Sequence, residues 1–141
     1  MKTLLRNVLA VVLGLVVGGV VNMGLVMAGA HLVPPPADVN INDARSIAAH
    51  IGEFGPKHFL FPFLAHALGT LVGAAVAFLI GFRHRWIAAW VVGLMFLAGG
   101  IGAATMIPAP IWFIVLDLVV AYLPMAWLGG TLVQRVSGGG E

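Results

Sequence analysis

The chain has 141 residues, of which 61% are hydrophobic and only 9% are charged, and its mean hydropathy is +1.07. This composition excludes an ordinary soluble domain and indicates that most of the chain lies in lipid. Although the pI is near 9.7, the seven Lys and Arg residues lie at the ends of apolar runs, which argues against a nucleic-acid surface. The sequence has no cysteine, so it can form no disulfide, thiol nucleophile or thiolate metal site.

Four apolar runs cover most of the chain, over residues 4–33, 58–82, 86–107 and 111–133. Each is long enough for the roughly 20 residues that a membrane-spanning helix needs. None shows the alternation of a strand, and a backbone in lipid must satisfy its own hydrogen bonds. The short connections after the second and third runs force neighbouring helices to be antiparallel. We therefore predict an all-α polytopic membrane protein, an antiparallel four-helix transmembrane bundle formed by one domain over residues 1–141.

The first run also has features of a signal peptide. It follows a basic start and contains Ala28-Gly29-Ala30, which matches an A-x-A cleavage site. Its apolar region is, however, about 20 residues long, whereas signal peptides usually have 7 to 15. We therefore expect the segment to stay in the protein as the first span.

The connection over residues 34–57 is the longest segment outside the predicted spans. Pro34-Pro35-Pro36 ends the first helix, because prolines remove backbone donors and fix φ. Residues 42–56 predict a short helix, with Asn42 or Asn40 as its cap and Gly55-Pro56 as its stop. Its apolar residues recur at helical spacing and give an amphipathic helix that lies over the mouth of the bundle or in the headgroups. Whether it is a lid or only a connector stays open.

The distribution of basic residues predicts the orientation of the chain. Arg45 and Lys57 lie in the 34–57 loop, whereas the other five flank the opposite ends of the spans: Lys2, Arg6, Arg83, Arg85 and Arg135. Cytoplasmic loops carry an excess of Lys and Arg. We therefore expect both termini in the cytoplasm and the 34–57 loop on the outer face.

Small residues recur at helical spacing in the spans. Gly14 and Gly18 share a face of the first, and Gly69 and Gly73 share a face of the second. Such GxxxG-type rows let helix backbones approach closely in lipid. They predict tight packing inside the bundle or contact with further copies or a larger membrane complex, and the pattern does not separate these uses.

Three polar residues lie at one predicted depth in three different spans. From a rise of 1.5 Å per residue, His66 is about 12 Å, Asn22 about 13 Å and Asp117 about 9 to 10 Å from the outer end of its helix. Thr70 shares a helix face with His66, and Thr105 lies somewhat closer to the outer face. We expect Asn22, His66 and Asp117 to turn inward and, with Thr70 and Thr105, to form a binding or proton-relay cluster.

His66 is the natural partner for Asp117, because a carboxylate among membrane helices is costly without one. Asp117 would accept from one imidazole nitrogen, and the pair would titrate as a unit and could bind or pass a proton. Tyr122 lies about 140° around a regular helix from Asp117, so we expect it outside the cluster. A purely structural role, in which the polar network fixes the helix positions, stays open.

Other chemistry has less support in the sequence. Serine occurs only at Ser46 and Ser137, outside the spans, and no nucleotide, phosphate or metalloprotease motif is present, so we do not expect an enzyme. No cofactor is predicted. Imidazole and thioether ligands would suit copper, and paired histidines would suit haem, with His31, His50 and His58 as weak metal candidates.

The stretches FPFLAHALGTLVGA and PAPIWFIVLDLVVAYLPMAWLGG resemble small bacterial four-span membrane proteins of no assigned function. The resemblance implies a bacterial inner-membrane protein and brings no activity with it. Small multidrug-resistance transporters have the same number of spans, but the glutamate of their first span has no counterpart here.

The leading hypothesis is proton-coupled binding or transport of a small solute. The alternatives are a non-catalytic accessory or assembly subunit of a larger membrane complex, and a haem or copper redox protein.

Overall fold

The computed structural model describes residues 2–138, which contain helices and no strand. Four helical segments are long and apolar enough to cross a membrane, as the composition predicts. The first is α1 (Lys2–Leu32), and the second is α3 (Leu60–Ile80), which follows directly on the 3-10 turn η2 (Pro56–Phe59). The third is α4 (Arg85–Met106), and the fourth consists of α5 (Ile111–Val120) and α6 (Leu123–Gly138). The predicted helical bundle is therefore confirmed.

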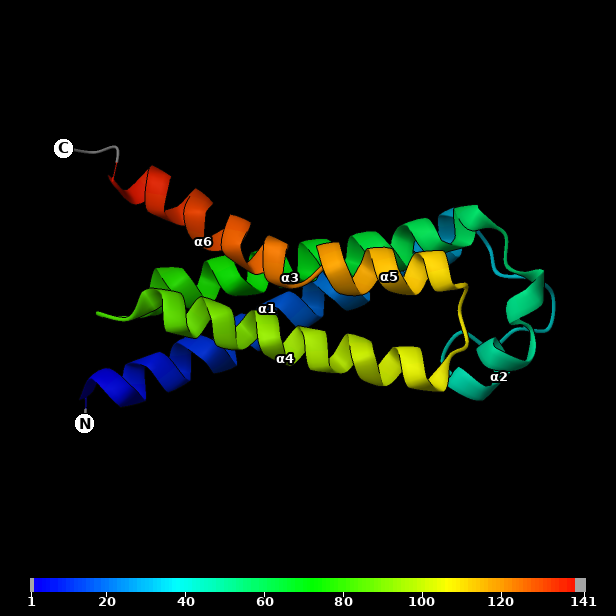
Figure 1. The fold of residues 1–141 in the computed structure, drawn as a ribbon, viewed down its shortest axis with the longest axis horizontal. Helices are drawn as coiled ribbons and strands as arrows, with labels where there is room; N and C mark the ends of the chain where they lie inside the picture. Colours follow the sequence, from blue (N-terminus) through cyan, green and yellow to red (C-terminus); the bar gives the residue numbers. More distant parts are fainter. Residues whose placement is uncertain (1, 139–141) are drawn as a thin grey trace.

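The spans lie antiparallel along one long axis, with the start of α1 and the end of α6 at the same end of the bundle (Figure 1). We call this end the terminal end, and the turn over residues 81–84 lies there too. The opposite end, the loop end, holds α2 (Ala44–Ala49) and the connection from α4 to α5. The central helix is α3, because α1, α4 and α6 all pack against it.

Glycines bring α1 and α3 into backbone contact. Gly14 and Gly18 of α1 face Gly73 and Gly69 of α3, and a Cβ at either α1 position would lie 2.5 Å from the facing carbonyl oxygen. Gly19 of the same helix has nothing within 4 Å of a would-be Cβ. In lipid, where apolar burial does not drive helices together, such close contact is a main source of attraction. The inward glycines therefore set the distance between α1 and α3.

Small side chains fill the interior, and large apolar ones point outward. The main core cluster consists largely of alanines, with one valine and one phenylalanine: Ala10, Ala74, Ala77, Phe78, Ala88, Ala89, Val92 and Ala126. Leu4, Val16 and Val119 are examples of large apolar residues with more than half of their surface exposed. An exposed apolar surface of this extent requires a partner or a membrane. The four spans therefore place the protein in a lipid bilayer.

The segment that joins α1 to α3 begins with a capped helix, but the cap is not the predicted one. The side chain of Asp43 accepts the backbone N–H of Arg45 at 3.0 Å and caps α2. Asn40 instead accepts the N–H of Asn42 at 3.0 Å, in the turn before the helix. The prediction of Asn42 or Asn40 as the cap is wrong, because the chain enters α2 later than the polar run suggested.

The predicted helix over residues 42–56 is also shorter than expected. α2 ends at Ala49, and a 3-10 turn, η1 (Ile51–Glu53), follows before the chain enters η2. Ile47 of α2 and Ile51 of η1, both on the predicted apolar stripe, face a cavity at the loop end. The amphipathic segment therefore lies over the mouth of the bundle.

The fourth span is interrupted where α5 ends and α6 begins, with Ala121 and Tyr122 in a turn between them. Pro124 explains the break, because it has no N–H for the carbonyl of Val120 and its ring would collide with that carbonyl in a continuous helix. Figure 1 shows α6 leaving the line of α5. Pro62 does not interrupt α3, because it lies in the first turn, where a proline is tolerated.

Candidate functional site

His66 of α3 and Asp117 of α5 are in direct contact inside the bundle. His66 Nδ1 lies 2.9 Å from Asp117 Oδ1 and 3.0 Å from Oδ2. The Asp117 side chain is only 6% exposed, whereas the His66 side chain keeps 23% of its surface accessible. The contact predicted between these residues is therefore present, and its role stays a prediction. We call these two residues the His66–Asp117 pair.

The hydrogen bond of the pair constrains the imidazole of His66. A neutral imidazole that donates from Nδ1 to the carboxylate keeps Nε2 free as an acceptor, and a protonated one donates from both nitrogens. The carboxylate fixes which nitrogen is engaged and orients the ring. The contact of Nδ1 with the carboxylate therefore suits either form of the ring.

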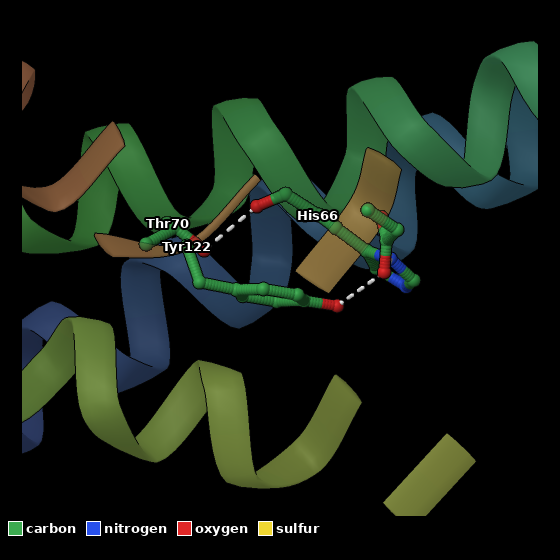
Figure 2. Close-up of polar contacts among 4 residues, drawn as sticks. His66, Thr70 and Tyr122 are labelled. Atoms are coloured by element: carbon green, nitrogen blue, oxygen red, sulfur yellow. Dashed lines mark hydrogen bonds and ion pairs between the residues drawn. The ribbon is translucent and has the colours of Figure 1, made fainter. Parts of the chain in front are cut away.

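Tyr122 is a third member of the site. Its hydroxyl donates to Asp117 Oδ2 at 2.8 Å, and its ring stacks on that of His66 with centroids 5.7 Å apart (Figure 2). Tyr122 is almost fully buried, and its phenol lies against Gly100 of α4, where a side chain would overlap it. The site therefore draws on α3, α4, α5 and the turn after α5.

The expectation that Tyr122 lies outside the cluster is wrong. It assumed a regular helix, in which Tyr122 would be on the wrong side of the span from Asp117. The turn at Ala121 and Tyr122 releases the chain from that geometry. The signal in the sequence was Pro124, since a proline inside a helical run ends or kinks the helix before it.

Thr70 belongs to the site only through the backbone. Its hydroxyl donates to the carbonyl oxygen of His66 at 2.7 Å, one turn earlier on α3, and its side chain is fully buried (Figure 2). This bond satisfies the hydroxyl within its own helix. Thr70 therefore contributes to the packing behind His66, and its hydrogen bond does not reach the imidazole or the carboxylate.

Asn22 and Thr105 are not joined to the pair by any hydrogen bond between described residues. Asn22 packs against Gly69 at the contact of α1 with α3, and Thr105 is exposed and donates to the carbonyl of Gly102 at 2.7 Å. Asn22 has the expected depth, since Gly69 is about one turn from His66.

A cavity of about 250 Å³ opens beside the pair, between α1, α3, α4 and α5 in the loop-end half of the bundle. His66 and Asp117 line it, and most of the remaining wall is apolar, as at Phe61, Phe113 and Ile114. Lining by a few polar groups in an apolar wall is typical of small-molecule sites. The pair is therefore accessible to a ligand in this cavity and is not sealed in a packed core.

The loop-end segment covers the cavity. Ile47, Ile51 and Phe54 line it from above, together with His58. His58 Nδ1 accepts the backbone N–H of Gly55 at 3.0 Å, which fixes the ring at the start of η2. Residues of α2, η1 and η2 therefore form the loop-end wall of the cavity.

The three weak metal candidates differ in their surroundings. His31 is exposed at the end of α1, His50 Nδ1 lies 2.9 Å from the carbonyl oxygen of Ser46, and His58 bonds to Gly55. Within residues 2–138, no three His, Asp or Glu side chains are grouped as metal ligands.

Comparison with known proteins gives no match to a family model, to a curated protein or to a solved structure.

Proposed function

We propose that the protein binds a small solute in the cavity beside His66 and Asp117, and that this pair exchanges a proton as the solute binds. Such a protein would act in proton-coupled binding or transport across the membrane. The observation that carries the proposal is that the buried carboxylate and its imidazole partner line a cavity. Ionisable groups inside membrane spans that face a cavity commonly mark solute or proton pathways.

The cavity argues for a solute that is small and mainly apolar. Its volume of about 250 Å³ is below the roughly 300 to 1,000 Å³ of pockets for drug-sized ligands. Aromatic and aliphatic side chains form most of the wall, and the pair supplies the polar groups. A ring or short chain with one hydroxyl, amine or carbonyl group would match this wall.

Charge balance links the solute to a proton. A neutral imidazole beside an ionised carboxylate leaves a net negative charge among the spans, and one proton removes it. A solute that brings a positive charge would replace that proton, whereas a neutral solute that accepts a hydrogen bond would favour its uptake. Tyr122 supports either state, because its hydroxyl donates to Asp117 throughout.

The proposed location is a bacterial inner membrane, with both termini in the cytoplasm. The support is that five of the seven basic residues lie near the terminal end of the bundle. In this orientation the cavity lies in the outer half of the membrane, under the 34–57 loop.

The test is a proton titration of the purified protein in unbuffered detergent between roughly pH 5 and 8, where histidines titrate. Because the chain has five histidines, the difference between wild type and His66→Gln isolates the contribution of His66. We expect Asp117→Asn to change that contribution. The matched control is Asp38→Asn, since Asp38 is exposed and its φ of 67° suits asparagine.

The second arm uses 4-fluorobenzyl alcohol, a ring with one hydroxyl, because a cavity of about 150 Å³ already holds benzene. Binding of this probe is measured by fluorine NMR. It should change proton uptake in wild type and not in Asp117→Asn. Ala103→Leu in the cavity wall should block the probe, whereas Ala98→Leu on the exposed face of the same helix should not.

A titration that is identical in wild type and Asp117→Asn, with no probe binding, would contradict the proposal. The pair would then serve only to fix helix positions. That result would favour the accessory or assembly subunit as the function.

A further inference from the structure

A second concave site lies at the terminal end, on the opposite side of the membrane from the cavity. It is an open groove between the turn that precedes α4 and the end of α6. Its polar rim consists of Arg83, His84 and Arg85 on one side and Gln134 and Ser137 on the other. We call it the terminal groove. It shares no residue with the site described above.

The cations of the terminal groove have no carboxylate partner among residues 2–138. Three of the carboxylates in this part of the chain, those of Asp38, Asp43 and Glu53, belong to the loop-end segment, and the fourth, Asp117, is engaged by His66. The His66–Asp117 contact is the one ion pair found in these residues. Within residues 2–138, Arg83 and Arg85 of the rim are therefore not neutralised by a carboxylate.

The turn that carries these cations is held in place by α1. Arg6 Nε donates to the carbonyl oxygen of Ile80 at 2.8 Å, and Asn7 Oδ1 accepts the N–H of Phe82 at 2.8 Å. Arg83 has a φ of 58°, a conformation that few non-glycine residues adopt. The tight turn over residues 81–84 therefore presents Arg83, and Arg85 directly after it, from a fixed backbone.

The floor of the terminal groove is apolar, unlike the floor expected of a site for a free ion. Phe78, Trp86 and Ile87 line it, with the Phe78 and Trp86 rings packed edge to face at 5.0 Å. The Arg85 guanidinium carbon lies 6.0 Å from the centre of the Phe78 ring. Charged donors above an aromatic floor match a molecule that is anionic at one end and apolar at the other.

We propose that the terminal groove binds the phosphate of an anionic phospholipid such as phosphatidylglycerol. The phosphate would lie between Arg83 and Arg85, and the start of the acyl chains would lie against Phe78 and Trp86. Arginine binds phosphate through parallel hydrogen bonds, and basic pockets between spans at the membrane surface are suited to lipid headgroups. The groove lies at the ends of two spans, which is headgroup depth.

The test is native mass spectrometry of the full chain with phosphatidylglycerol and with phosphatidylcholine. In wild type we expect phosphatidylglycerol to bind at least roughly tenfold more tightly, a preference set by the two arginines. Arg83→Asn with Arg85→Gln should abolish the preference, and asparagine is chosen because it tolerates the positive φ of Arg83. The control, Arg45→Gln with Lys57→Gln, removes the same charge at the loop end and should keep the preference.

Three results would overturn this inference. These are equal binding of the two lipids by wild type, an equal loss of preference in the control, and displacement of the lipid by soluble glycerol phosphate at similar concentration. Folding of each variant is checked by tryptophan fluorescence during thermal unfolding. If the double variant does not fold, Arg85→Gln alone, an exposed change in the first turn of α4, should still lower the preference.

Discussion

Replacing His66 and Asp117 with leucine, singly and together, should reveal strong coupling between them. Each single replacement leaves its partner without the hydrogen bond of 2.9 Å that joins them. Asp117 is 4% exposed in the wild-type structure. In His66→Leu its carboxylate therefore stays buried, with Tyr122 as the remaining donor. In Asp117→Leu, the imidazole and the phenol both lose their acceptor.

The expected magnitudes follow from this geometry. Breaking a fully buried ion pair costs about 3 to 5 kcal/mol. The partial exposure of His66 admits water, so we expect about 2 to 3 kcal/mol for each single variant. In the double variant only the Tyr122 hydroxyl loses its partner, so the expected loss of stability is about 2 kcal/mol. The coupling energy is then about 2 to 4 kcal/mol, at or above the upper end of values for residues in contact.

The assay is unfolding in detergent followed by tryptophan fluorescence, since the chain has four tryptophans and none belongs to the pair. Asp117→Asn is the matched control, because its amide can accept from Tyr122 and donate to His66. It should cost less than about 1 kcal/mol. Single effects that add to the double effect within about 0.5 kcal/mol would show that the two side chains are not paired in the membrane protein.

Three further predictions use matched variants or a reporter. Gly100→Ala should lower the free energy of unfolding by roughly 1 to 3 kcal/mol, because the added methyl overlaps the Tyr122 phenol. Gly99→Ala, with nothing within 4 Å of the added methyl, should not, and unfolding measurements check both variants. Gly18→Ala should likewise separate α1 from α3 and lower stability, whereas Gly19→Ala should be neutral or slightly stabilising. Reporters fused to either terminus should be found in the cytoplasm, and an outward reporter would reverse the proposed orientation.

The bundle could be predicted because a bilayer allows few solutions. Long apolar runs must form helices there, and prolines and charged residues mark where they end. His66 and Asp117 could be predicted as partners for a related reason. They lie at similar depth in adjacent spans, and a carboxylate among spans needs a partner. Both inferences depend on depth along a helix, which residue number gives directly.

Depth alone does not decide which of the other polar residues are hydrogen-bonded to the pair. Asn22 has the depth of His66, but it faces Gly69, where α1 and α3 meet. Thr105 lies near the same end of the bundle, and its hydroxyl bonds to its own helix at Gly102. Which side of a helix faces which neighbour depends on packing between small residues, and several faces of these spans carry such residues.

Tyr122 shows how a local break changes which residues can act together. In a continuous fourth span, Tyr122 would turn away from Asp117, and the carboxylate would have His66 as its one donor. Pro124 interrupts the helix, and the turn before it brings the phenol to 2.8 Å from Asp117. The phenol is thus a second donor to the carboxylate beside the imidazole, so Asp117 is hydrogen-bonded by two side chains. Pro124 makes no hydrogen bond to either residue of the pair. The site formed by the pair and Tyr122 nevertheless depends on the helix break at this proline.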